Sequence, residues 1–174
     1  LKYLKGLSQK RLWKEIKLCL KDGSDILNYL KKFNVLKTLG FSYPGQAFLE
    51  RIDIGSIQFD VNPVNTLIIA LLEKKNIRGY TFEKSFLQQI KYVQEVNNKV
   101  LRNIEVVHKL FKLEEYSLLY LFAKYPKNSI IIENFFDNRE KLQPELNGDD
   151  IKKLGIKESP EVGWLIKRII EGKW

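Results

Sequence analysis

With 174 residues, the chain has the length of one domain or of two small helical lobes that share a core, and its content of 44% hydrophobic and 29% charged residues is that of a globular protein, which argues against disorder. Cys19 is the only cysteine, which excludes an intrachain disulfide and favours a reducing, cytoplasmic setting, and no apolar run reaches the roughly 18 residues that a membrane span needs. Thirty Lys and Arg against 21 Asp and Glu give a formal charge of +9, which indicates a polyanionic partner unless it serves solubility alone.

Helical periodicity dominates the first forty residues. Ser8 is a candidate N-cap for a helix that runs to about Lys21, and Asp22-Gly23 ends it. The predicted apolar face of this helix consists of Leu12, Ile16, Cys19 and Leu20. Ser24 is the predicted cap of a second helix, whose inward residues are Ile26, Leu27, Leu30 and Phe33.

The next segment alternates turns with apolar stretches. Tyr43-Pro44-Gly45 predicts a turn, and Pro44 suits the first turn of a short helix to about Arg51. Residues 52–61 alternate weakly and contain a glycine, so a strand or a loop fits there, and we favour the loop. Pro63 then opens a strongly apolar helix over residues 64–75.

The central region is predicted to be helical throughout. The spacing predicts one long helix over residues 82–102 with Thr81 as its candidate N-cap, and the apolar pattern continues to Phe111. Two further helices are predicted at residues 114–124 and 130–142, because a proline follows closely after each of them.

The last segment predicts two helices joined by a tight turn. Residues 147–150 open a short helix that Gly155 closes, and Ser159 caps a second helix with Pro160 at its first position. The apolar stripe of the second helix consists of Val162, Leu165, Ile166, Ile169 and Ile170. The whole pattern predicts an all-α, multi-helix fold that ends in a helix-hairpin-helix-like pair.

Motifs for catalysis are missing. The sequence contains no P-loop, dinucleotide fingerprint, zinc spacing or nucleophile motif. His108 stands among apolar residues, which favours a structural role over that of a general base. Asp149 and Asp150 would suit a metal ion, but the helix dipole alone accounts for acids in a first turn. We therefore predict no catalytic residue and no metal site.

The basic residues give a clearer pattern. Ten Lys and Arg stand against three Asp and Glu in residues 1–40, and nine stand against five in residues 76–128. A stripe along the first helix is formed by Lys10, Lys14, Lys17 and Lys21. At the rise of an α-helix this stripe runs about 16 Å, enough to follow two or three phosphates of a nucleic acid. The alternative is a solvated face, although Glu15 is the only acid within the helix.

A second candidate for phosphate binding is the turn before the last helix. A glycine-closed turn that leads into a helix N-terminus presents free N–H groups, which suit a phosphate, and Lys152, Lys153 and Lys157 flank it. Glu158 and Glu161 instead favour a plain capped helix pair, because they place negative charge where the phosphate would lie.

The C-terminal run over residues 146–170 resembles a known family signature. It is similar to the end of bacterial class II tRNA nucleotidyltransferases, which are the CCA-adding, CC-adding and A-adding enzymes, with their poly(A) polymerase relatives. The residues that match are Gly148, Asp149, Asp150, Leu154, Gly155, Pro160 and Gly163. The chain departs from the family pattern at Asn147, where Thr is usual, and at Glu158-Ser159, where Pro-Gly is usual.

A second likeness lies at the other end of the chain. The neck helix of this family carries the pattern Ser-x-Glu-Arg-Ile-x-x-Glu-Leu. The residues that fit it are Ser8, Arg11, Leu12, Glu15 and Ile16. Lys10 replaces the first Glu, residues 25–44 are similar to the end of the neck, and the middle matches only in helical character.

The resemblance implies a division of the chain and a function. Residues 1–43 would be the end of the neck and the start of the body, residues 44–128 the helical body, and residues 129–174 the tail. These parts would hold the acceptor and T arms of tRNA. A catalytic head before Leu1 would bind Mg²⁺ and CTP or ATP, so this chain needs no cofactor or small-molecule substrate, and Arg11 and Glu15 would contact that head. The absence of Met and the initial Leu also predict a piece of a longer parent.

The rival interpretation is a helical protein-interaction or scaffold domain with no RNA role. Its candidate anchors are the three tryptophans Trp13, Trp164 and Trp174. A complete small enzyme would require a catalytic cluster that the sequence does not supply.

Overall fold

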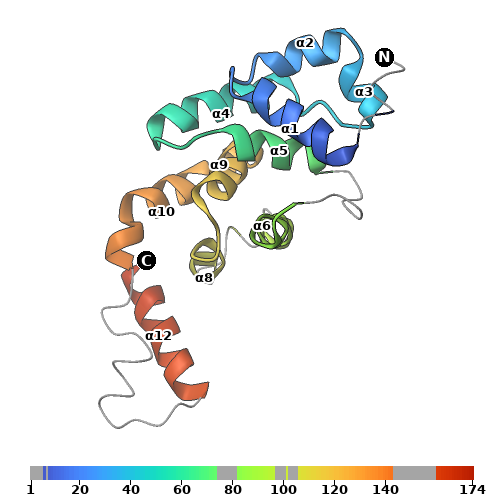
Figure 1. The fold of residues 1–174 in the computed structure, drawn as a ribbon. Coiled ribbons are helices and arrows are strands. Elements are labelled where there is room, and N and C mark those ends of the chain that lie inside the picture. Colours follow the sequence, from blue (N-terminus) through green and yellow to red (C-terminus); the bar gives the residue numbers. More distant parts are fainter. Residues whose placement is uncertain (1–5, 7, 74–81, 97–100, 102–105, 143–159) are drawn as a thin grey trace.

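The computed structural model describes residues 6, 8–73, 82–96, 101, 106–142 and 160–174, and over these ranges the chain is all-α, without a strand. Figure 1 shows the N-terminal helices at one end, a middle layer, and the last helix extending away at the other end. The helices are α1 (Gln9–Leu20), α2 (Ile26–Lys32), α3 (Val35–Leu39), α4 (Gln46–Gln58), α5 (Val64–Leu72), α6 (Lys84–Glu95), α8 (Val106–Leu110), α9 (Glu115–Lys124), α10 (Ser129–Leu142) and α12 (Pro160–Lys173), with a 3-10 turn η2 (Pro126–Asn128) before α10.

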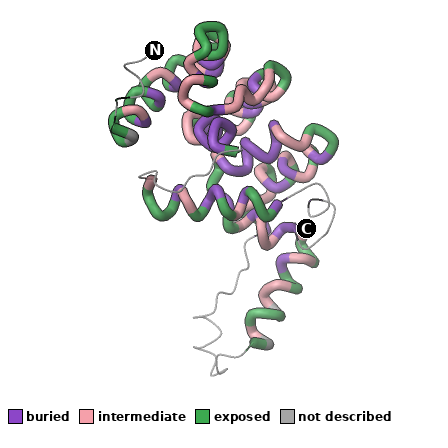
Figure 2. Tube along the Cα trace, turned by 90° about the vertical axis from the view of Figure 1, so that its right-hand side faces the viewer, coloured by how far each residue is buried: buried purple, intermediate pink, exposed green. Residues whose placement is uncertain are grey.

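The helix at the centre of the core is α9. It packs against α4, α5, α6 and α10, and every residue from 117 to 123 is buried. Such burial is expected of a helix that is apolar nearly all round. Figure 2 shows the buried residues gathered where these middle helices meet. The core therefore joins segments that are far apart in the sequence.

A glycine allows α4 to lie close to α9. A Cβ atom on Gly55 would come within 2.6 Å of Leu119 Cδ1 and 2.9 Å of Phe122 Cδ1. Just after α4, Phe59 stacks on Phe136 of α10 with the ring centroids 4.1 Å apart. The contact between α4 and α9 thus depends on the absence of a side chain at position 55.

The first helix forms as its sequence predicts. The backbone N–H of Arg11 donates to Ser8 Oγ at 3.4 Å, which is an N-cap hydrogen bond, and Ile16 and Leu20 are buried. Trp13 is also buried, against the rings of Phe41 and Phe82, so it is a core residue and no exposed anchor. Cys19 is only half-buried.

The loop favoured over residues 52–61 is wrong for residues 52–58, because α4 continues to Gln58. Ile52 and Gly55 face the core, whereas Ile54 and Ile57 are exposed. Because apolar residues lie on both faces of the helix, the 3.6-residue repeat of apolar residues that marks a helix is weak in this segment. Packing against α9 instead stabilises the helix here.

The second helix differs from expectation at both ends. Ser24 does not cap it. The Ser24 hydroxyl instead donates to Asp53 Oδ2 of α4 at 2.6 Å. Phe33, predicted to point inward, is exposed because it follows the last helical residue, and Asn34 then adopts a left-handed φ of 56°. The long helix predicted from residue 82 ends at Glu95, where Val96 becomes extended.

The last described helix begins at Pro160, as predicted, and packs against α8 and α10. Ile170 is buried, but Ile169 of the predicted stripe is exposed. The first helix of the predicted hairpin lies outside the described residues. Over the described ranges, no helix has the length and apolarity that crossing a membrane requires.

Candidate nucleic-acid interface

The four lysines of the predicted stripe are all exposed. Lys10, Lys14 and Lys17 belong to α1 itself, and Lys21 is its C-cap residue. Because Trp13, Ile16 and Leu20 fix the other side of α1 in the core, these lysines share a rigid support. A row of cations on a fixed helix loses less conformational entropy on binding a polyanion than a row on a mobile segment.

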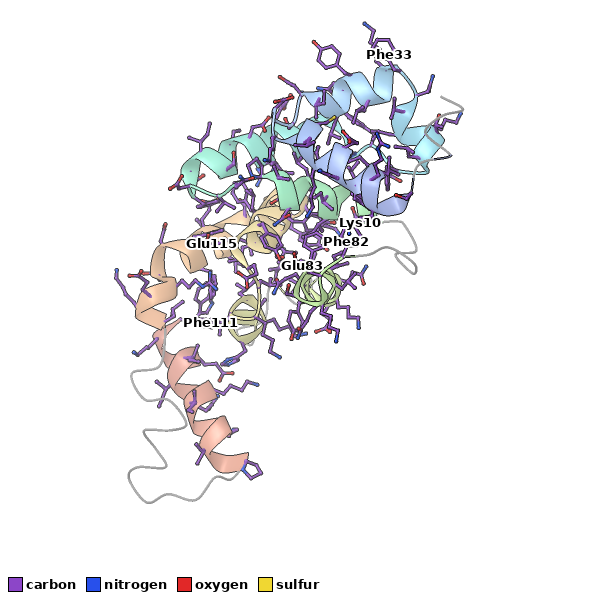
Figure 3. The ribbon with its side chains drawn as sticks, in the orientation of Figure 1. Lys10, Phe33, Phe82, Glu83, Phe111 and Glu115 are labelled. Atoms are coloured by element: carbon purple, nitrogen blue, oxygen red, sulfur yellow. The ribbon has the colours of Figure 1, made fainter. Side chains whose placement is uncertain are left out.

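The lysine face of α1 borders an open groove of about 1060 Å³. Figure 3 shows Lys10 of α1 near Phe82 and Glu83, at the start of α6. The groove is lined on the α1 side by Ser8, Lys10, Arg11, Trp13, Lys14, Glu15 and Lys17, and on the other side by Asn65, Phe82, Glu83, Ser85, Phe86, Glu114 and Tyr116. One wall is therefore mainly basic, and the facing wall carries two carboxylates.

Lys21 lies beside a second, smaller hollow of about 420 Å³. This hollow shares Asn65, Glu114 and Tyr116 with the larger groove, so the two adjoin. The four lysines consequently follow one continuous depression at this end of the molecule.

The acidic wall determines where a phosphate can lie. Glu83 and Glu114 would repel a phosphate placed deep in the groove, whereas the outer rim of α1 presents lysines to solvent. Burial, and then the charges of Glu114 and Glu83, raise the pKa of Tyr116 above its ordinary value of 10.0. The phenol therefore stays protonated at neutral pH. The arrangement suits a polyanion that follows the rim, with neutral polar groups deeper in the groove.

The other predicted site residues have different outcomes. Arg11 and Glu15 are exposed on α1 and line the groove, and their contact with a catalytic head stays a prediction. Lys152, Lys153 and Lys157 lie outside the described residues, and their contact with a phosphate stays a prediction.

His108 has a structural contact. Its Nε2 lies 3.2 Å from Glu171 Oε1, which joins α8 to α12. Partial burial alone would raise the pKa of Glu171, but hydrogen bonds with His108 and Arg168, together with the charge of Lys167, lower it. This contact fits the structural role predicted for the histidine. Among the described residues, no three His, Cys, Asp or Glu side chains gather as metal ligands.

The sequence did not predict the side of the groove that faces α1. Glu83, Glu114 and Tyr116 are more than sixty residues from α1 along the chain, and nothing in their spacing indicates that they meet it. Only the packing of α1 on α5, and of α6 on α9, brings these residues together.

Fold and groove define the class of this protein as all-helical, with a basic helix along an open groove. Comparisons with protein-family models, with curated proteins and with solved structures find no match for the chain.

Proposed function

We propose that this chain is the tRNA-binding region of a tRNA nucleotidyltransferase, which adds CMP, AMP or both to tRNA 3′ ends. The observation that carries the proposal is the exposed lysine row of α1 on a helix anchored in the core. The likeness of both chain ends to class II nucleotidyltransferases supports it. Catalysis would belong to a head that precedes this chain in its parent protein.

The contacts would be made mainly with the RNA backbone. Double-stranded RNA is read through its shape, its phosphates and its 2′-hydroxyls, because side chains cannot enter its narrow major groove. Lysines on the rim of α1 fit that mode, since each supplies a solvated point charge without demanding a particular base. Glu83 and Glu114 would keep the backbone on the outer rim and so set its path past α1.

The proposal assigns Mg²⁺ and the nucleotide to the head. The described residues gather no carboxylate cluster that would fit Mg²⁺, and we derive no catalytic step from them. The role of this chain would be to hold the acceptor and T arms of tRNA while the head acts on the 3′ end.

The test is a salt series of tRNA binding, with duplex DNA of similar length as the control. The chain should prefer tRNA, and log affinity should fall with log salt by roughly 0.7–0.9 per phosphate contacted. Replacing Lys10, Lys14, Lys17 and Lys21 with Gln should reduce that slope by about 2. The matched control replaces four exposed lysines elsewhere, Lys84, Lys91, Lys127 and Lys141, with Gln. Equal losses in both variants, or no tRNA binding at low salt, would contradict the proposal.

A second candidate function is a protein-interaction or scaffold domain. It is favoured by the outer face of α4, where Ile54 and Ile57 are 59% and 84% exposed. This candidate predicts a partner whose binding depends little on salt and fails when Ile57 is replaced with Asp. It becomes the better account if tRNA does not bind in the salt series.

A further inference from the structure

Two aromatic rings project into solvent at the C-terminal end of α2. Tyr29 is 59% exposed and Phe33 is 63% exposed, and the two residues lie four positions apart, so they share one side of the helix end. Figure 3 shows Phe33 at the outer end of the molecule, directed away from the core. The helix beneath these rings is fixed, because Leu27 is fully buried. The rings therefore contribute little to the core and are accessible from solvent.

The sequence around these rings is basic. Lys31, Lys32 and Lys37 are exposed, and residues 26–40 contain no Asp or Glu. Lys32 Nζ lies 6.0 Å from the centroid of the Phe33 ring, and Lys31 Nζ lies 4.1 Å from that of Tyr43. The nearest acids in sequence, Asp22 and Asp25, precede α2 and so stand at its other end. The charge around the rings therefore suits an anion.

A second aromatic contact supports the helix that carries Tyr29. The Tyr43 hydroxyl donates to Asn28 Oδ1 of α2 at 2.5 Å, so the residue under Lys31 is tied to the same helix as Tyr29. Burial, and then the charge of Glu50, raise the pKa of Tyr43, so this hydroxyl keeps its proton at neutral pH. This contact thus supports α2, but it holds Lys31 on another side of the helix than Tyr29, because residues two positions apart do not face each other.

This combination matches the chemistry of unpaired nucleotides. Bases stack on exposed aromatic rings without sequence preference, and neighbouring lysines neutralise the phosphates between them. A base pair within a duplex cannot use such a surface, because its faces are already stacked. An apolar protein partner would fit the aliphatic face of α4 better than two rings among lysines.

We propose that Tyr29 and Phe33 form a stacking platform for two unpaired nucleotides of an RNA, with Lys32 contacting an adjoining phosphate. The platform shares with the proposed function only the premise that RNA is the ligand. It requires neither the α1 lysines nor a nucleotidyltransferase parent.

The test compares single-stranded and duplex RNA on the full chain. Fluorescein-labelled eight-nucleotide oligo(U) and a twelve-base-pair RNA duplex are each titrated with the original chain and with the double variant Tyr29→Ala, Phe33→Ala. Oligo(U) should bind at least about 25-fold more weakly to the double variant, which is about fivefold per ring, and duplex affinity should change less than twofold. The conservative variant Tyr29→Phe should keep oligo(U) binding. Trp164→Ala is the matched control, because it removes a ring that is 57% exposed on α12.

The outcomes separate the platform from its alternatives. Because both rings are more than half exposed, the variants should keep the original helical circular dichroism signal and melting temperature. Unchanged oligo(U) affinity in the double variant, or an equal loss in Trp164→Ala, would overturn the proposal. Loss of self-association in sedimentation, with RNA affinity intact, would identify a protein interface instead. If the tRNA salt series fails while the oligo(U) result holds, the proposed function falls and the platform stands.

Discussion

The contact between α4 and α9 and the contact between α8 and α12 are held by different forces. In the first contact, Gly55 lies so close to Leu119 and Phe122 that no space remains for a side chain at position 55. The second includes the contact of His108 Nε2 with Glu171 Oε1, and within α12 the side chains of Lys167 and Arg168 also approach that carboxylate. Middle-layer stability should therefore respond to side-chain volume, whereas attachment of α12 should respond to pH and salt.

The largest effect is expected at Gly55. Gly55→Val should lower the free energy of unfolding by about 3 kcal/mol, because its side chain would meet Leu119 and Phe122 inside a close-packed core. Chemical denaturation measures this change. Gly163→Ala in α12 is the matched control, since nothing lies within 4 Å of the added Cβ, and helix propensity should make it about 0.5–1 kcal/mol more stable. A Gly55→Val protein as stable as the original would contradict the packing account.

An intermediate effect is expected where α2 meets α4. Ser24→Ala should cost about 1–2 kcal/mol, because it leaves the part-buried Asp53 carboxylate without the Ser24 hydroxyl. Thr38→Ala removes the exposed hydrogen bond to the Asn34 carbonyl and should cost less than about 0.5 kcal/mol. Thermal unfolding measures the stability that each variant loses. Equal losses of stability in the two variants would show that burial of the hydrogen bond does not determine the size of the loss.

The smallest effect is expected at Glu171. Since its pKa is lowered in the folded protein, its ionised form stabilises the docked α12, and that stabilisation is fully present above the ordinary pKa of 4.5. It is lost as the pH falls through the lowered folded-state value. Hydrogen exchange of α12 measured from pH 6 down to pH 3 should show this loss, and Glu171→Gln should remove the acid-dependent part of it. An unchanged pH profile in the variant would exclude Glu171 as its source.

Local signals in the sequence predicted several elements well. Ser8 caps α1, Pro160 opens α12, and the apolar runs of α5 and α9 are helical and buried. In each case a cap, a proline or a clear apolar pattern indicates the helix without help from distant residues.

Where the prediction failed, tertiary contacts decide the structure. Helix α4 carries Ile54 and Ile57 on its outer face, so its apolar pattern is not that of a helix with one buried side. Phe33 looked like a core residue, yet the end of α2 turns it outward. The lysine row was predictable because it lies within one helix, whereas Glu83 and Glu114 reach the groove only through folding.

Lysine-acetylation footprinting of the unmodified chain shows directly whether the lysine face of α1 binds RNA. Mass spectrometry would compare the acetylation rate of each lysine with and without saturating tRNA at low salt. The account predicts that Lys10, Lys14, Lys17 and Lys21 become protected, while the exposed Lys84, Lys91 and Lys141 react as before. Bound tRNA that leaves the α1 lysines as reactive as in the free protein, or that protects all exposed lysines equally, would contradict it.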